Sequence, residues 1–563
     1  MIASLCLTRR ASLRLLPRQL LLALLLIGAV VRPLAAATAS RGMVAAEHEL
    51  AAKAGVLMLE HGGNAIDAAV AAAFATGVAN PSSCGIGGGG FALVYDGKTH
   101  EAHFIDFRET APAAATPDMY VRDGHPDPRL SLRGALAIAV PGEVKGLARV
   151  LRDFGTLPLA TVLAPAIRFA AEGFPVGSHL AAELGSNAEE IRRHPALAAV
   201  YLKPSGEPYA AGELLVQRDL AATLRAIAAG GVRAFYEGPI GEAIAEAIAA
   251  EKGLLTAADL RGYRERLRKP LTTHYRGLTV IGASPPSSGG VVLEILNVLG
   301  GYDLRSEGPR SALALHRVAQ AESLAFRDRA ESYGDPDFVD VPMARLLSPA
   351  HTEQLRRQIA SPPPVPTAAP AEKGGTAHTS AVDVHGNAAA LTSTVNTAFG
   401  SMVLVPGTGI ILNNEMDDFS SAPGAPNVYG LVGSNANAIH AGKRPLSSMS
   451  PTLVLRNRAP LLAIGASGGP RIITSTLLTI VNVVDFGMDL ERAVATPRIH
   501  DQAIPARLFF EPALDPTIVA GLRKLGHELV EARDLGAVQA VWVSGGSLVG
   551  IADPRKGGAA AGW

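Results

Sequence analysis

A proline-rich segment divides this chain into two parts. "SPPPVPTAAP" occupies residues 361–370 and contains five prolines. Proline fixes φ and lacks a backbone N–H, so this segment can form neither a helix nor a central strand. It ends at Gly374-Gly375, and the run from Thr376 has the pattern of a strand. Two interpretations follow: a linker that meets a strand at Thr376, or a place where the chain is cut.

Bulk composition restricts the class of protein. A chain of 563 residues can bury a large core and, by length alone, form two to four domains. Apolar residues make up 48% and charged residues 18%, which indicates a globular protein. Basic and acidic residues both number 51, and no long basic run is present. Nucleic acid is therefore not an expected partner.

The first residues are typical of an export signal. Four arginines precede the apolar run "LLLALLLIGAVV" at residues 20–31, and small residues follow in "PLAAATAS". We expect a signal peptide that ends at Ala37 or Ala39, and hence a periplasmic or secreted protein. The alternative is a retained membrane anchor, although a bilayer span needs about 20 apolar residues.

Cysteine and histidine usage gives no sign of a metal site. Cys6 would leave with the signal, so Cys84 would be the one cysteine of the mature chain, which we expect to be buried and inert. No Cys/His cluster has the spacing of metal ligands. The sequence therefore predicts neither a metal nor a cofactor.

Periodicity predicts helices first and a strand-rich final third. Residues 47–63 fit an amphipathic helix that ends at a Gly-Gly pair, and residues 64–81 fit a buried, alanine-rich helix. Gly87–Gly90 precede a strand, so we interpret them as a site of close backbone packing rather than a phosphate loop. The pattern of residues 140–360 predicts mainly helices. Strands are predicted at 379–396, as a hairpin around His385-Gly386-Asn387, and at 458–469 and 538–554, with a helix over 516–531.

Thr376 would gain chemical competence from a break in the chain. A threonine hydroxyl is a weak nucleophile without a neighbouring base. An N-terminal threonine carries that base itself, because an α-amine has a pKa of about 7.7–8.0 and can accept the hydroxyl proton. In the intact chain Thr376 has no free amine, so this chemistry requires cleavage between Gly375 and Thr376. The residues alone still allow a linker followed by an ordinary strand.

Many blocks of the sequence, in order, resemble the γ-glutamyltransferases, a family of self-processing N-terminal-nucleophile hydrolases. The resemblance extends from about Ser40 to Trp563. It rests on "GMVAAEH", "GGNAIDAAVA", "IDFRETAP", "TAHTSAVDVHGNAAALTSTVNTAFGS", "GIILNNEMDDFS", "PNVYGLVGSNANAI", "KRPLSSMSPT", "GASGGPRIITS" and "ADPR".

The resemblance implies a fold and a processing step. The fold would be α+β, a four-layer αββα sandwich built jointly by a large chain (residues 40–375) and a small chain (residues 376–563) that form a heterodimer. Thr376 would cut the chain at Gly375 and then serve as the nucleophile, starting a central strand. Thr394 would bond Thr376 and support the cleavage.

The resemblance also implies a binding pocket and a reaction. Arg108, with Ser447 and Ser448, would hold the carboxylate of a γ-glutamyl group, since a guanidinium can grip a carboxylate with two parallel bonds. Its ammonium would meet Asp418, Glu415 and Asn396. The remaining expected site residues are Gly468 and Gly469, whose N–H groups would stabilise the oxyanion, and Tyr429, the gate of a loop over the pocket.

The expected enzyme transfers the γ-glutamyl group of glutathione or a related amide, through an ester on Thr376, to water or to an amino acid or peptide. Two alternatives remain open. A β-lactam side-chain acylase of the same fold would adapt the pocket to a carboxylate without an ammonium. An exported amino-acid-binding protein would stay one chain and release its ligand unchanged, as a catalytically idle relative would also stay uncut.

Overall fold

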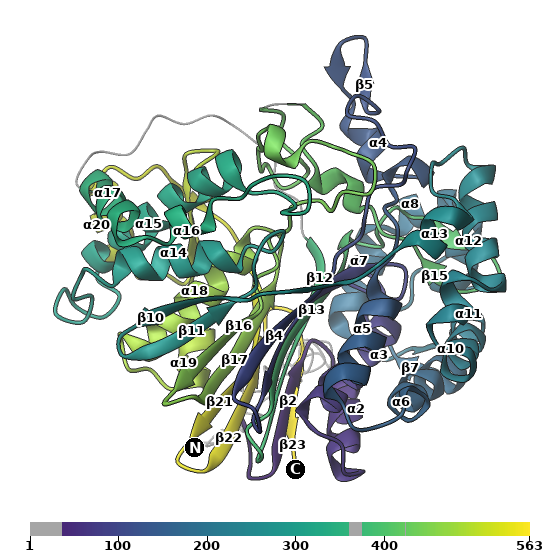
Figure 1. Ribbon diagram of the computed structural model, residues 1–563, viewed down its shortest axis with the longest axis horizontal. Helices are drawn as coiled ribbons and strands as arrows, with labels where there is room; N and C mark the ends of the chain where they lie inside the picture. The colour runs from purple at the N-terminus through teal and green to yellow at the C-terminus, as the bar shows by residue number, and fades with distance from the viewer. Residues whose placement is uncertain (1–35, 360–373, 423) are drawn as a thin grey trace, which may run out of the picture. The chain divides into compact units, whose positions relative to one another are not determined.

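The computed structural model describes residues 36–359, 374–422 and 424–563 (Figure 1). The predicted proline-rich segment and residues 1–35 of the predicted signal peptide lie outside these ranges. Within them, no helix is long and apolar enough to cross a membrane.

Two large antiparallel sheets form the centre of the described structure. Sheet A has the strand order β1 (Ala37–Ala39), β22 (Ser547–Ala552), β21 (Ala537–Ser544), β17 (Ala459–Ser467), β16 (Thr452–Arg456), β11 (Leu278–Gly282), β10 (Leu271–Tyr275). Sheet B has the order β23 (Ala559–Gly562), β2 (Gly42–Ala46), β12 (Gly374–Asp383), β13 (Ala388–Thr397), β3 (Gly89–Asp96), β4 (Glu101–Phe107), β9 (Arg266–Arg268).

The two sheets pack face to face through β12, β13, β17 and β21. His378 of β12 lies against Gly465 of β17, where an added Cβ would stand 2.3 Å from the imidazole ring. The ring also contacts the hydroxyls of Thr392 and Ser380, at 2.8 and 3.1 Å. Burial lowers the pKa of His378 to about 3, so a neutral imidazole fills the space between the sheets.

Helices cover the outer face of each sheet (Figure 1). On sheet B lie α2 (Glu49–Glu60), α3 (Ala65–Ala79) and α5 (Glu143–Phe154). Beyond them are α6 (Leu159–Glu172), α7 (Ser178–Ser186), α8 (Ala188–Arg193), α9 (Pro195–Tyr201), α10 (Arg218–Gly230), α11 (Val232–Tyr236), α12 (Pro239–Ala250) and α13 (Ala257–Gly262). On sheet A lie α14 (Gly289–Leu299) and α18 (Arg471–Val484), followed by α15 (Ala312–Ser332), α16 (Met343–Leu346), α17 (Pro349–Ile359), α19 (Leu490–Ala495) and α20 (Pro516–Lys524). The predicted four-layer αββα sandwich is confirmed.

Short elements complete the described chain. They are the helix α4 (Pro128–Leu132), the 3₁₀ turns η1 (Ala135–Ala137), η2 (Glu415–Asp418) and η3 (Asn435–Asn437), and the strands β5 (Val121–Arg122), β6 (His125–Pro126), β7 (Phe174–Pro175), β8 (Leu214–Leu215), β14 (Leu404–Val405), β15 (Ile410–Ile411), β18 (Ile499–His500), β19 (Leu508–Phe510) and β20 (Leu529–Glu531).

The structure confirms two of the predicted local elements and contradicts others. The alanine-rich helix is α3, which is almost wholly buried and begins with a capping box between Asn64 and Asp67. The hairpin is β12–β13. The helix predicted over 516–531 is wrong in its second half: α20 ends at Lys524, Gly526 has a φ of +91°, and β20 follows. Strands β9, β10 and β11 were also missed within the region expected to be helical.

Near the N-terminus, β1 pairs with β22 and overlaps the predicted end of the signal peptide at Ala37 or Ala39. Cleavage after Ala39 would remove this edge strand, cleavage after Ala37 would remove its first residue, and sheet A keeps its other strands in both cases. The cleavage point stays a prediction.

The glycine run packs backbone against backbone, as predicted. An added Cβ would stand 1.9 Å from the carbonyl oxygen of Thr394 at Gly88 and 2.1 Å from that of Thr392 at Gly90. Real Cβ atoms do not approach this closely, so both positions need a residue without a side chain. The run thereby allows β3 to lie against β13, the strand that carries Thr394.

We expect Gly88→Ala to lower the free energy of unfolding by about 1–3 kcal/mol or more, because the new methyl group must push β13 aside. Gly185→Ala is the matched control, since its Cβ would meet nothing within 4 Å and alanine suits a helix. Denaturant unfolding of both variants checks this, and equal midpoints for the two would contradict it.

Candidate active site

Thr376 lies at an irregularity in the pairing of two central strands. β12 pairs with β13 from Gly374 to Val382, and the register shifts between Gly375 and Thr376. Because the chain is intact, β12 begins at Gly374 in the described residues, not at Thr376 as predicted for the cut chain. After the shift Thr376 lies opposite Thr394. A bulge of this kind re-aims a side chain at the end of a strand.

Thr394 connects the hydroxyl of Thr376 with the peptide bond before it. Thr394 Oγ1 donates to the carbonyl oxygen of Gly375 at 2.7 Å and accepts from the N–H of Asn396 at 2.8 Å. The hydroxyls of Thr376 and Thr394 are 3.2 Å apart. Since the Thr394 proton is committed to Gly375, its free lone pair suits a hydrogen bond donated by Thr376. A hydroxyl thus lies beside a carbonyl that already accepts a hydrogen bond.

Gly468 and Gly469 form the turn between β17 and α18. Both have positive φ, at +127° and +61°, which favours glycine at each position. A Cβ added to Gly374 would lie 2.7 Å from the backbone nitrogen of Gly469, so this N–H is next to the segment that precedes Thr376. Gly468 in turn packs against Gly536, with 2.9 Å between its added Cβ and the Gly536 Cα.

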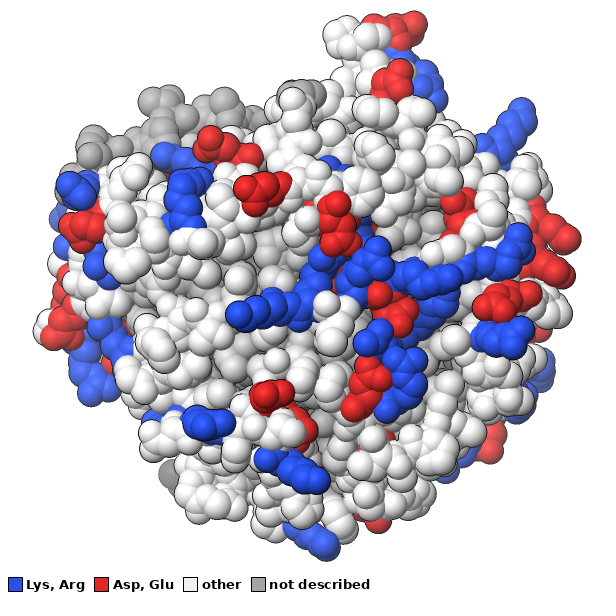
Figure 2. Space-filling model, viewed as in Figure 1, with Lys and Arg blue, Asp and Glu red and all other residues white. Residues whose placement is uncertain are grey.

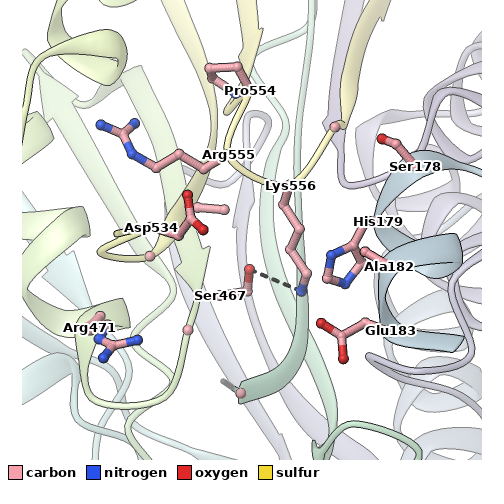
Figure 3. A pocket seen from close by; sticks show the side chains of 15 residues that line it. Ser178, His179, Ala182, Glu183, Ser467, Arg471, Asp534, Pro554, Arg555 and Lys556 are labelled. Carbon is pink, nitrogen blue, oxygen red and sulfur yellow. Dashed lines mark hydrogen bonds between the residues drawn. The ribbon is translucent and has the colours of Figure 1, made fainter. Parts of the chain in front are cut away.

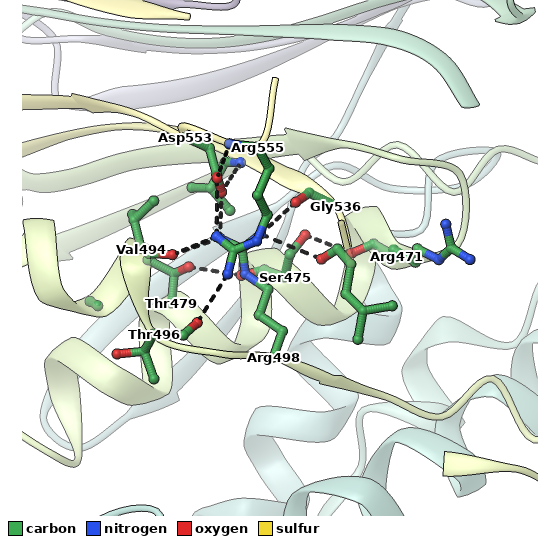
Figure 4. A network of polar contacts seen from close by, with 12 residues as sticks. Arg471, Ser475, Thr479, Val494, Thr496, Arg498, Gly536, Asp553 and Arg555 are labelled. Carbon is green, nitrogen blue, oxygen red and sulfur yellow. Dashed lines mark hydrogen bonds and ion pairs between the residues drawn. The ribbon is translucent and has the colours of Figure 1, made fainter. Parts of the chain in front are cut away.

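A buried arginine network supports this turn (Figure 4). Arg498 donates to the carbonyl oxygens of Gly536 and Val494 and forms an ion pair with Asp553. Arg555 bridges Asp553 and Glu511. The side chain of Arg498 is 2% exposed, so these charges are held almost without water. The network fixes the Gly536 loop against the predicted oxyanion glycines.

The predicted pocket charges are brought together and paired with one another. Arg108 contacts Glu415 at 2.6 Å and also forms an ion pair with Asp418, while its Nε donates to the carbonyl oxygen of Pro445. Glu109 lies 3.6 Å from the same guanidinium. Asp418 additionally accepts from the side chain of Asn427 at 3.0 Å.

The electrostatics of this cluster are unbalanced towards negative charge. Burial raises the pKa of Asp418 and, more strongly, that of Glu415, and Arg108 opposes both shifts. Burial raises the pKa of Glu109 to about 8. Several carboxyl groups therefore share one directly paired guanidinium, and an added cation would relieve the cost of ionising them.

Ser447 and Ser448 lie beside a second buried arginine that sequence reasoning did not single out. Arg329 of α15 donates to Ser448 Oγ at 3.3 Å and to Ser288 Oγ at 2.9 Å. Ser447 Oγ accepts from the N–H of Met449 at 3.2 Å. Burial lowers the pKa of Arg329 to about 10, so it stays charged at neutral pH. An arginine within a long helix gave no sequence signal for this position.

Tyr429 links the surroundings of Thr376 with the Arg108 cluster. Its hydroxyl donates to the carbonyl oxygen of Asn396 at 2.6 Å, and its ring lies 2.9 Å from an added Cβ at Gly469. Its backbone N–H donates to Asn427 Oδ1, and Asn427 binds Asp418. An almost continuous set of contacts thus runs from Thr376 through Thr394 and Asn396 to Tyr429, Asn427 and the Arg108 cluster. The predicted site residues therefore belong to one region.

Lys556 and Glu47 are further residues that the sequence did not reveal. Lys556 Nζ donates to the carbonyl oxygen of Thr376, lies 2.7 Å from Glu47 Oε2 and contacts Ser467 Oγ at 3.3 Å. Glu47 Oε1 also accepts from the N–H of His378. Burial raises the pKa of Glu47, and Lys556 opposes that shift. These two residues are distant in sequence and meet only where β2 and the C-terminal loop flank β12.

A cavity of about 300 Å³ opens beside Lys556 (Figure 3). Gly374, Ser467 and Gly468 line it, together with His179 and Glu183 of α7. Arg471 and Asp534 also line it. The cavity is therefore lined by charges of both signs and touches the segment next to Thr376.

The chain is similar to known proteins over most of its length. The family profile described as Gamma-glutamyltranspeptidase matches residues 51–563. The Glutathione hydrolase proenzyme of Escherichia coli (strain K12) is 42% identical over 529 residues, covering 92% of this chain and 91% of that protein. The Acylase ACY 1 proenzyme of Pseudomonas sp. (strain V22) is 41% identical over 537 residues, covering 93% of each.

Solved structures have the same fold. A cephalosporin acylase from Bacillus halodurans has a TM-score of 0.85 at 30% identity, covering 94% of this chain and 97% of that one. The gamma-glutamyltranspeptidase of Helicobacter pylori has a TM-score of 0.54 at 38% identity, covering 55% of this chain and 90% of that one.

We expect Lys556→Met to lower the free energy of unfolding by about 3–5 kcal/mol, because it leaves Glu47 buried without its cation. The double variant Lys556→Met/Glu47→Gln should recover part of this loss, since no unpaired charge remains. Denaturant unfolding measures both, with the exposed Lys98→Met as control. A single variant as stable as the control would show that the pair has no such role.

Proposed function

This chain belongs to the gamma-glutamyltranspeptidase family, whose members are N-terminal-nucleophile hydrolases, and on that premise we propose that Thr376 both cuts the chain and serves as the catalytic nucleophile. The products are a large chain of residues 40–375 and a small chain of residues 376–563, which stay together as a heterodimer. The observation that carries the proposal is the hydrogen bond from Thr394 to Gly375 O with the Thr376 hydroxyl beside it.

The cutting step is an internal acyl transfer. Thr376 Oγ attacks the Gly375 carbonyl carbon, the C–N bond breaks, and the nitrogen becomes the free α-amine of Thr376. Water then hydrolyses the resulting ester, which leaves a carboxylate on Gly375 and restores the hydroxyl. Thr394 supports this step, because its donated hydrogen bond stabilises negative charge that develops on the Gly375 oxygen.

Turnover repeats the same chemistry on a substrate. The new α-amine accepts the hydroxyl proton, directly or through water, and Thr376 Oγ attacks the γ-carbonyl of the donor. The N–H groups of Gly468 and Gly469 stabilise the oxyanion, a contribution of about 2.7–4 kcal/mol for one donor in comparable sites. The leaving amine departs with a proton, and water or an amine acceptor then releases the γ-glutamyl group from the ester.

The charge pattern around Arg108 favours a zwitterionic donor group. Arg108, Ser447 and Ser448 bind the α-carboxylate, and Asp418, Glu415 and Asn396 receive the ammonium. When a γ-glutamyl group binds, its carboxylate can pair with Arg108 and its ammonium with Asp418. Each residue then exchanges its present partner for a ligand group of opposite charge. A ligand with a carboxylate alone would leave Asp418 without compensation, at a cost typical of breaking a buried pair.

Glutathione is the donor we propose, because several relatives that are 41–42% identical to this chain are named as glutathione hydrolase proenzymes. The cavity next to Gly374 offers room for the leaving group and for an amino acid or dipeptide acceptor. We also propose that the chain is exported, since the region before the described residues has the pattern of a signal peptide.

A second candidate is the β-lactam side-chain acylase, since acylases are among the relatives and solved structures. Asp418 and Glu415 favour the γ-glutamyl reading over this one, because an acylase substrate without an ammonium has no use for two buried carboxylates. A ligand-binding protein without catalysis would give no cut.

We expect Thr376→Ala to remain one uncut and inactive chain, because the same oxygen performs both steps. Denaturing electrophoresis and N-terminal sequencing of wild type should give a small fragment that begins Thr-Ala-His-Thr. Thr376→Ser keeps a hydroxyl and should still be cut, and Thr379→Ala on the same strand is the control. Two normal fragments from a folded Thr376→Ala chain would overturn the proposal.

We expect Asp418→Asn to be cut normally and to lose about 30-fold or more in kcat/KM for a γ-glutamyl anilide, the equivalent of at least about 2 kcal/mol for a buried charge contact. The matched substrate is a glutaryl anilide, which lacks the ammonium. The variant should turn over the glutaryl anilide, the slower of the two substrates, about as fast as wild type does. The ratio of kcat/KM for the γ-glutamyl anilide to that for the glutaryl anilide should therefore be smaller in the variant than in wild type. A wild type that prefers the glutaryl anilide would favour the acylase.

A further inference from the structure

Two carboxylates and an imidazole meet among three helices on the side of sheet A. Glu294 lies on α14, Asp328 on α15 and His351 on α17, and these helices pack against one another. One possible ligand atom of each residue lies within 4.8 Å of the others. His351 Nε2 is 2.7 Å from Asp328 Oδ2 and 3.3 Å from Glu294 Oε1.

The carboxylate of Glu294 is buried, and no hydrogen-bond donor among the described residues satisfies it. Its side chain is 1% exposed, and among the described residues neither carboxylate oxygen accepts a hydrogen bond of acceptable geometry. Its contact with His351 is an ion pair at 3.3 Å. Buried carboxylates are normally hydrogen-bonded, paired or bound to a metal, and one weakly engaged partner leaves this group under-satisfied.

Tyr333 adds a second buried polar atom at the same place. Its side chain is fully buried, and its hydroxyl has no hydrogen-bond partner within the part of the chain that the structure describes. A Cβ added to Gly290 would lie 2.7 Å from this hydroxyl. Gly290 precedes Glu294 by one turn of α14, so the phenol oxygen lies over the helix face that carries Glu294.

Two carboxyl groups and one imidazole face one another at this cluster. A divalent cation between them would supply the partner that Glu294 and Tyr333 lack. Imidazole nitrogen together with carboxylate oxygens is the donor set of Zn²⁺ and of Mn²⁺.

We propose that Glu294, Asp328 and His351 bind one divalent transition-metal ion, Zn²⁺ or Mn²⁺, with the Tyr333 hydroxyl beside it. The site differs from the sequence-based expectation of no metal, and its ligands are too far apart in sequence for spacing to reveal them. It is independent of the chemistry proposed for Thr376.

The ion would act on structure. It joins α17 to α14 and α15, and α17 ends at Ile359, the last described residue before the segment that leads to Gly375. In the processed protein α17 would be the last described helix of the large chain. The ion would therefore hold that helix against α14 and α15.

The test uses the full, untagged protein. Metal content is measured by mass spectrometry after growth with both ions, and chelator-treated protein is titrated with Zn²⁺ and Mn²⁺ by calorimetry. We expect one ion per chain, and binding weakened at least about tenfold in Glu294→Gln and His351→Gln. Glu353→Gln on α17 and His385→Gln are matched controls, since both side chains are exposed.

Thermal unfolding separates a bound ion from a bridging imidazolium. The chelator should lower the Tm of wild type and of both controls and leave the two site variants unchanged. Wild type that binds neither ion in stoichiometric amount, or site variants that bind as tightly as wild type, would overturn the proposal. If one variant fails to fold, the metal content of wild type and the other variant, or Asp328→Asn, still decide.

Discussion

The register of β12 on β13 is the constraint on which the candidate site depends. The bulge after Gly375 places Thr376 opposite Thr394 and leaves the Gly375 carbonyl within reach of the Thr394 hydroxyl. A slip by one residue would turn every side chain of β12 to the other face of sheet B. The glycine run fixes β13 from the other side, because it allows β3 to approach the Thr394 backbone. His378 fixes β12 against sheet A, where Gly465 leaves room for its ring.

Charge is buried on both sides of this strand pair, with a different consequence on each side. Lys556 pairs with Glu47 and also donates to Thr376 O and Ser467, so it holds the strand. The Arg108 cluster has more carboxyl groups than directly paired guanidinium groups, so it can take up a cation together with an anion. Across the face shown in Figure 2, by contrast, Lys and Arg are interspersed with Asp and Glu. The charges with a distinctive arrangement are therefore the buried ones, not those on this face.

Sequence reasoning reached what depends on neighbours along the chain. The buried, alanine-rich helix α3, the β12–β13 hairpin and the tight glycine run each have a local physical cause, and all were predicted. The predicted pocket residues came from the family resemblance, and the structure gathers them into one region. Local patterns could not locate Lys556, Glu47 or Arg329, because each acquires its meaning from a partner far away in sequence. The strands β9 and β10 were missed because they lie at sheet edges, where exposed residues weaken the apolar pattern of a strand.

In the intact chain, the two glycines before Thr376 occupy space beside the candidate active site. Gly374 lies against the Gly469 nitrogen and near the Tyr429 hydroxyl, with 3.4 Å between that oxygen and an added Cβ. A side chain at Gly375 would stand 2.4 Å from the Thr397 carbonyl oxygen, so neither glycine could be replaced without displacing the strands. The residues that precede Thr376 thus occupy the space beside the N–H group proposed to stabilise a substrate oxyanion. Breaking the Gly375–Thr376 bond would provide the amine that the nucleophile needs and allow this segment to leave, so a single event would both activate the hydroxyl and open its binding site.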